Sequence, residues 1–189
     1  MNDHAHHGHA HAPLAYRDDV AEQRSSKDAF FKRSPHSPIP STERAAFDGL
    51  AYYEIDESWR FVPAALEPLE PGLDFEMHVQ TSDGAVRQGH RAGVFRFSVG
   101  GIAQRLTALQ LSGTGDDALF VPFIDATSGT ETYGAGRYLD LERLPDGRYD
   151  LDFNFAYAPF CAYSPAYSCP LPPAENRLTV AITAGERER

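Results

Sequence analysis

The sequence is short of basic residues, and this shortage argues against several classes of partner. Lys and Arg total 17 against 27 Asp and Glu, which gives a formal net charge of −10. So acidic a chain gains little from contact with phosphate groups or anionic lipids, and we expect neither nucleic acid nor a membrane as a partner. The sequence also lacks an apolar run near the roughly 20 residues that a membrane-spanning helix needs, and its first residues do not follow the pattern of a secretory signal. We therefore expect a soluble, cytoplasmic protein.

Cysteine is scarce as well. The two that occur, Cys161 and Cys169, are too few for a disulfide scaffold and too far apart for a CxxC redox or zinc motif. Free cysteine is among the most buried residue types, so we favour two small core residues over a local disulfide or a redox or metal-responsive thiol pair. The chain also has no GxSxG elbow and no HExxH motif, so nothing supports a serine hydrolase or a zincin.

Three segments follow one another along the chain. Residues 1–13 contain five of the eight histidines, and we expect a disordered tail that would bind transition metals loosely at most. Residues 14–46 predict a helical segment, ending near Arg33, and then a stiff proline-rich connector. Residues 47–189 predict one all-β domain, which is long enough to bury a single hydrophobic core.

The β prediction depends on short alternating runs that are separated by turn signals. Residues 73–79 alternate between apolar and polar, and Asp83-Gly84 predicts a hairpin into the next strand. Residues 119–124 are apolar on both faces and predict a central strand, with Pro122 at a bulge or an unpaired edge. The later predicted strands are 138–141, 148–156 and 178–182. We expect an antiparallel barrel-like roll or sandwich of about eight or nine strands with an N-terminal helical extension.

Polar residues concentrate between residues 125 and 157, where they alternate with aromatic residues and glycines. Strict alternation in 148–156 would place Asp152 and Asn154 on one face of a strand. A buried Asp152 would need a cation, and Arg137 is the candidate partner because its planar guanidinium pairs well with a carboxylate. The glycine-rich loop 128–136 either cradles an anionic group or is a plain structured turn, and we favour the turn.

These residues suggest a small-molecule-binding β-domain, with or without catalytic activity, in which Arg137 holds a small anionic molecule. The candidate ligand-binding residues are Asp125, Thr132, Tyr133, Arg137, Asp152, Asn154 and Tyr157. In a competing interpretation they form a buried polar network in a structural or protein-interaction module. Asp125, Glu131 and Asp152 are also candidates for hard-cation ligands or an acid/base pair. The sequence specifies no cofactor.

Several long motifs also resemble a known family. The segments FDGLAYYEIDESWRFVPAAL, FVPFIDATSGTETYGAGRYLDL, LDFNFAYAPFCAY, YSCPLPPAENRL and ITAGE are similar to the signature of DUF1684, an uncharacterised prokaryotic family. The resemblance runs from about Phe47 to Glu186 and implies no activity, because that of the family is unknown. Two positions depart from the family pattern: Ala158 stands where the family usually has Asn, and Tyr53-Glu54 stands where it usually has Phe-Pro.

Overall fold

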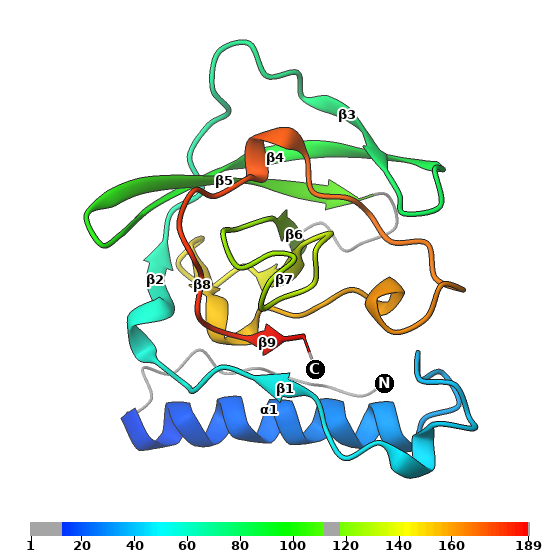
Figure 1. Ribbon diagram of the computed structural model, residues 1–189. Helices are drawn as coiled ribbons and strands as arrows, with labels where there is room; N and C mark the ends of the chain where they lie inside the picture. Colours follow the sequence, from blue (N-terminus) through cyan, green and yellow to red (C-terminus); the bar gives the residue numbers. More distant parts are fainter. Residues whose placement is uncertain (1–12, 112–117, 189) are drawn as a thin grey trace.

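The computed structural model describes residues 13–111 and 118–188, and the predicted histidine-rich tail, residues 1–13, lies outside them except for its last residue (Figure 1). The elements are α1 (Pro13–Arg33), β1 (Ala51–Tyr52), β2 (Arg60–Ala64), β3 (Glu76–Gln80), β4 (Val86–Val99), β5 (Ile102–Leu111), β6 (Ala118–Phe123), β7 (Arg137–Glu142), β8 (Tyr149–Asp152) and β9 (Glu186–Arg187), with short 3₁₀ turns between them. The named strands pair antiparallel. The predicted fold class, a mainly antiparallel β roll or sandwich with an N-terminal helix, is confirmed. Among the described residues, no helix is long and apolar enough to cross a membrane.

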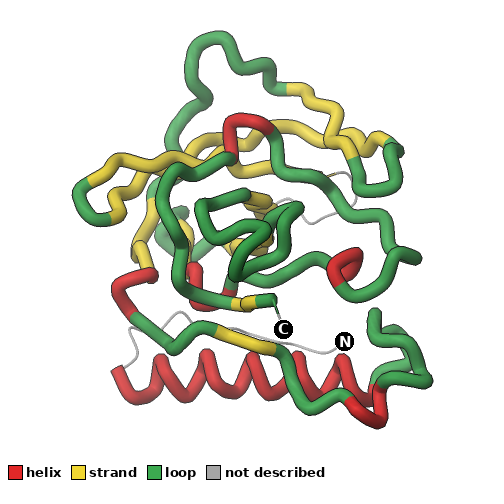
Figure 2. Tube along the Cα trace, in the orientation of Figure 1, coloured by secondary structure: helices red, strands yellow, loops and turns green. Residues whose placement is uncertain are grey.

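Five strands form the main sheet, in the order β3-β4-β5-β6-β7, and the other four form the pairs β2-β8 and β1-β9. In Figure 1, β3, β4 and β5 lie at the top and α1 lies at the bottom, beneath β1. Figure 2 shows that loops fill much of the space between them. The chain after β8 therefore contributes to the molecule mainly as loop and turn.

The turn signals of the sequence appear where they were expected. Asp83-Gly84 lies in the turn between β3 and β4, and Gly100-Gly101 joins β4 to β5 with φ of 57° and 81° at the two glycines. The predicted central strand is β6, between β5 and β7. The pairing of β6 with β5 is at Phe120, and Pro122 is paired only with β7. Pro122 is tolerated there because its missing N–H does not interrupt a ladder with β5.

Two predicted strands are wrong. Residues 178–182 are irregular, and the last strand is instead β9. The strand predicted at 148–156 ends at Asp152, because the Asp152 carboxylate accepts a hydrogen bond from the N–H of Asn154 and starts a 3₁₀ turn, Phe153–Phe155. Asp152 and Asn154 are therefore not on one face of a strand. The short polar side chain competes with the β ladder for the backbone.

The predicted helix is confirmed as one continuous helix, α1. Pro13 suits its first turn, where an N–H would have no partner, and Lys32 and Arg33 suit the negative end of the helix dipole. Tyr16, Val20 and Phe31 are buried. At helical spacing these three residues share one face with residues 24 and 27, so this buried stripe of α1 carries two basic residues, Arg24 and Lys27, in its middle.

The main hydrophobic core lies between the large sheet and the loops that follow β8. It includes Phe95, Leu106, Val121, Phe123, Leu139, Leu151, Phe153 and Ile182. A smaller cluster is formed by Val79, Leu109, Phe120, Tyr138 and Cys169. Ile182 reaches the core without belonging to a strand, so its apolar pattern was a correct sign of burial and a wrong sign of secondary structure.

Candidate functional site

Arg137, the first residue of β7, is one of the largest fully buried side chains. Its guanidinium donates hydrogen bonds to the carbonyl oxygens of Ala184, Glu186 and Ile182, and to the Asp125 carboxylate at 3.4 Å. Burial lowers the pKa of Arg137, and the nearby Asp125 opposes this shift. The terminal nitrogens of the predicted anion-binding group are thus occupied by the protein's own oxygens and tie the C-terminal segment to β7, while Arg137 Nε has no partner among the described residues.

The glycine-rich loop between β6 and β7 is held together by its own polar side chains. Thr132 is fully buried, with its hydroxyl 2.9 Å from that of Thr127, and the Thr127 hydroxyl donates to Asp125 at 2.8 Å. Gly129 and Gly136 have φ of 83° and 100°, a region that favours glycine. The loop has the geometry of a structured turn whose polar groups bond to one another.

Asp152 is buried in a second network. Its carboxylate accepts hydrogen bonds from the Tyr16 hydroxyl at 2.6 Å and from the backbone N–H and side-chain amide of Asn154. The predicted pairing of Asp152 with Arg137 is wrong: the nearest guanidinium is that of Arg60, with Nε at 3.8 Å. Burial raises the pKa of Asp152, while the hydrogen bonds from Tyr16 and Asn154 oppose the rise.

The two remaining predicted tyrosines lie apart from both networks. The Tyr157 hydroxyl donates to Asp140 at 2.6 Å, and the Tyr133 hydroxyl lies 3.8 Å from the Cys161 sulfur. Cys161 and Cys169 are free thiols, half-buried and buried respectively, and the Cys161 N–H donates to the Cys169 sulfur at 3.2 Å. Burial raises the pKa of Cys169 to about 11. A redox or metal-responsive role for the pair stays a prediction.

The candidate hard-cation ligands are not brought together. Asp125 and Asp152 belong to the separate networks above, and Glu131 is an exposed residue near Tyr53 and Arg187. Within residues 13–111 and 118–188, no group of three or more His, Cys, Asp or Glu is arranged to hold a metal ion. The carboxylates of the described residues are therefore not arranged as ligands around a common cation.

A cavity of about 240 Å³ lies between α1, β1 and the turn that follows β8. Its lining residues are Gln23, Arg24, Lys27, Tyr52, Asn154, Phe155, Ala156, Tyr157 and Phe160. Two of them are basic, four are aromatic and none is acidic. Asn154 and Tyr157 are the two predicted ligand-binding residues that line this cavity. We call this space the α1 cavity.

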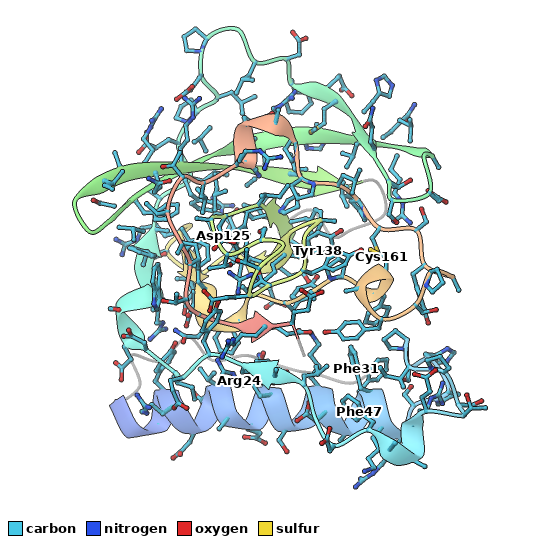
Figure 3. The ribbon with its side chains drawn as sticks, in the orientation of Figure 1. Arg24, Phe31, Phe47, Asp125, Tyr138 and Cys161 are labelled. Atoms are coloured by element: carbon cyan, nitrogen blue, oxygen red, sulfur yellow. The ribbon has the colours of Figure 1, made fainter. Side chains whose placement is uncertain are left out.

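Arg24 is a half-buried cation in the wall of the α1 cavity. It donates hydrogen bonds to the carbonyl oxygens of Tyr53 at 2.8 Å and Asn154 at 3.4 Å, and its guanidinium lies 4.5 Å from the centre of the Tyr52 ring. Figure 3 shows it between α1 and β1. No carboxylate of the described residues comes within 4 Å of it, in contrast to Lys27. Burial lowers the pKa of Arg24, which means that its charge is incompletely solvated.

Lys27, one turn further along α1, has a carboxylate partner. Its Nζ lies 2.5 Å from Glu186 Oε2 and 4.8 Å from the centre of the Tyr157 ring. Glu186 is buried behind the cavity wall, in β9, and also accepts a hydrogen bond from the backbone N–H of Ala158. Ala158 stands at the position where the family usually has Asn. The hydrogen bond to Glu186 does not depend on the side chain there, because its donor is a backbone group. The charges of Lys27 and Glu186 compensate each other, so Arg24 sets the net charge of the wall.

Unpartnered polar atoms gather around the same place. Arg24 Nε, the Tyr52 hydroxyl and Glu186 Oε1 are buried and have no hydrogen-bond partner among the described residues. Tyr52 and Glu186 lie opposite each other in the β1-β9 pair, and Arg24 and Tyr52 both line the cavity. Nearly all buried polar atoms in proteins are paired, so this concentration marks a place where a bound group would complete the hydrogen bonding.

The residues that distinguish the α1 cavity were missed in the sequence. Arg24, Lys27, Tyr52 and Phe155 were not among the predicted ligand-binding residues. A signal for the first two was present, because basic residues occupy the middle of a stripe that begins with Tyr16 and Val20. The other two come from β1 and a 3₁₀ turn, and only the tertiary structure brings them to the helix.

Comparisons with known proteins agree with this architecture. The family described as protein of unknown function (DUF1684) matches residues 45–187, a range that begins after α1. An uncharacterized protein of Haloarcula marismortui, with a structure determined by NMR in solution, is 39% identical with a TM-score of 0.69, and the match covers 93% of this chain and 95% of that chain. The unmatched part of this chain is too short to include all of α1, so the match extends into the residues of α1. None of the curated proteins matches the chain.

Proposed function

We propose that this chain, which belongs to the DUF1684 family of proteins of unknown function, is a small-molecule-binding protein that takes an anionic ligand in the α1 cavity. The observation that carries the proposal is Arg24, a partly desolvated guanidinium in the cavity wall without a carboxylate partner among the described residues. The proposal keeps the expected ligand class and moves the anion from Arg137 to Arg24.

The first argument is energetic. A cation that is withdrawn from water without a counterion lowers the stability of the fold, and a ligand anion would offset part of that cost. Arg24 Nε is a buried donor with no partner, and a charge-assisted hydrogen bond to a carboxylate is about twice as strong as one between neutral groups. The Tyr52 hydroxyl is a second unpartnered donor in the same wall.

The second argument concerns the charge of the ligand. The cavity lining includes Arg24 and Lys27 and no acidic residue, and Lys27 is already neutralised by Glu186 at 2.5 Å. Arg24 has no carboxylate in direct contact, and Glu54 and Asp152 act on its charge only at longer range. This balance favours a monoanion over a phosphate dianion or a polyanion.

The alternative function, a structural or protein-interaction module, is favoured by a different set of residues. Arg137, Asp125 and Thr132 are buried and bonded within the chain. These contacts support a role in holding the loop and the C-terminal segment, and they do not involve the α1 cavity. Both roles are compatible in one protein, because Arg137, Asp125 and Thr132 do not line the cavity. Glu186 joins the two groups, since its carbonyl accepts from Arg137 and its carboxylate contacts Lys27.

The test is a titration with sodium acetate, monitored by backbone amide NMR at constant ionic strength. We expect saturable shifts confined to residues 23–27, 52 and 154–160, with a dissociation constant on the order of 1 mM, since acetate offers few contacts. Arg24→Gln should abolish them. Arg17→Gln is the matched control, because Arg17 also lies on α1 and donates to one carbonyl, that of Ile55, outside the cavity.

Two results would overturn the proposal. One is the absence of saturable shifts in the wild-type protein. The other is a titration that is unchanged in Arg24→Gln while that variant keeps the wild-type pattern of resonances. Because Arg24 also bonds to the Tyr53 and Asn154 carbonyls, the spectrum of the unliganded variant shows directly whether β1 and the turn have stayed in place.

A further inference from the structure

The α1 cavity also indicates the kind of anion that it takes. We infer that its ligand is a small aromatic monocarboxylate, with the carboxylate at Arg24 and the ring against Phe155. This inference rests on the proposed function, because it assigns the ligand class of the same site. It follows from three independent properties of the cavity: its volume, a ring in its wall that makes no aromatic pair within the described residues, and its charge.

The volume fits one ring and one small polar group. An apolar cavity of ~150 Å³ is known to hold benzene, and drug-sized ligands occupy pockets of roughly 300 to 1,000 Å³. The α1 cavity, at about 240 Å³, lies between these limits. It is larger than a benzene ring alone needs and smaller than a fused, substituted ring system needs.

One ring of the wall packs against the main core but makes no aromatic pair within the described residues. Phe160 stacks on Phe30 and makes an edge contact with Tyr167, and Tyr157 packs its edge against Tyr138. Phe155, by contrast, is half-buried and has no ring partner among residues 13–111 and 118–188. Aromatic pairs contribute beyond the area that they bury, so a ligand ring gains more at Phe155 than an aliphatic group of equal size.

The charge arrangement completes the assignment. Two of the aromatic rings already face cations, Tyr52 under Arg24 and Tyr157 under Lys27. A cationic ligand would be repelled by Arg24, and a neutral ring would leave Arg24 Nε unpartnered. A carboxylate attached to a ring satisfies the guanidinium at one end of the cavity and fills the apolar remainder at the other.

The experiment compares sodium benzoate with sodium acetate, sodium cyclohexanecarboxylate and benzyl alcohol, in the same NMR titration. Benzoate should bind at least tenfold more tightly than acetate because it buries a whole ring. It should also bind about two- to tenfold more tightly than cyclohexanecarboxylate, the advantage expected of an aromatic pair. Benzyl alcohol, which has the ring without the charge, should bind at least tenfold more weakly than benzoate.

The variants separate the ring from the charge. Phe155→Leu should weaken benzoate binding about two- to tenfold, and should weaken it more than acetate binding, because acetate has no ring. Phe75→Leu is the matched control, since Phe75 is an exposed phenylalanine that directly precedes β3 in the sequence and does not line the cavity. Arg24→Gln should weaken both anions.

The outcomes distinguish this inference from the proposed function. Acetate binding that depends on Arg24, with benzoate no tighter than acetate or cyclohexanecarboxylate, would overturn the aromatic assignment and leave the anion site standing. Tighter benzoate binding that is insensitive to Phe155→Leu would place the ring elsewhere and also overturn the assignment. Binding of neither benzoate nor acetate would overturn the inference and the proposed function together.

Discussion

Arg137 provides the sharpest test of what holds this fold together. The substitution Arg137→Met keeps much of the apolar stem and removes the guanidinium from a site where its side chain is fully buried. It leaves the Asp125 carboxylate, equally buried, without its cation, and it leaves the carbonyl oxygens of Ile182, Ala184 and Glu186 without their donor.

The magnitude follows from these contacts. Removing one partner of a buried ion pair costs about 3 to 5 kcal/mol, because the other charge stays buried without compensation. Asp125 also accepts hydrogen bonds from the Ile182 N–H and the Thr127 hydroxyl, which keep part of its stabilisation. We therefore expect a loss of about 4 kcal/mol in the free energy of unfolding, a large part of the 5 to 15 kcal/mol that is typical of a domain.

Urea unfolding measures this loss through the single tryptophan, Trp59, which packs against the main core. With an m-value of about 2 kcal/mol/M, the midpoint should fall by about 2 M. The control is Arg148→Met, since Arg148 is half-exposed and its acidic partner, Asp146, is exposed as well. Its midpoint should stay close to that of the wild type.

A loss below about 1 kcal/mol in Arg137→Met would refute the reasoning. It would mean that the carbonyl oxygens and Asp125 find other donors. The guanidinium would then be free to serve a ligand, as the sequence suggested. A large loss of stability together with unchanged acetate binding at the α1 cavity would instead separate the structural network from the ligand site.

Two further predictions concern a buried acid and a glycine. Burial raises the pKa of Glu186 above its usual 4.5, so the native state binds this proton more tightly than the unfolded chain. The stabilisation from Glu186 is then present below pH 4.5 and is lost as the pH rises through the native pKa. Over that range the urea midpoint of the wild type should fall relative to that of Glu186→Gln. A difference between the two midpoints that does not change with pH would contradict this. Gly136→Ala should cost about 2 kcal/mol or more, because φ is 100° and a Cβ would lie 2.4 Å from the Phe123 carbonyl oxygen. Gly134→Ala, with 3.6 Å of clearance and no positive φ, should be close to neutral in the same urea assay.

Local signals in the sequence were sufficient for much of the fold. The helix up to Arg33, the hairpin turn at Asp83-Gly84 and the apolar central strand β6 were all predicted, because each depends on neighbouring residues along the chain. The two wrong strands failed where a nonlocal or capping contact changed the backbone. At Asp152 a carboxylate capped a turn, and at 178–182 the backbone oxygen of Ile182 was taken by Arg137 rather than by a neighbouring strand.

The sequence by itself determined that this is an acidic, mainly antiparallel β protein with an N-terminal helix, and it supplied an α1 stripe with Arg24 and Lys27 at its centre. Only the tertiary structure decided the partners of these cations. It placed Glu186 in contact with Lys27 and left Glu54 and Asp152 to act on Arg24 only at longer range, and it brought Phe155 to the same cavity. The physical reason is that spacing along a chain fixes which face a side chain shares, whereas the groups opposite that face, such as Glu186 and Phe155, come from segments more than 100 residues away.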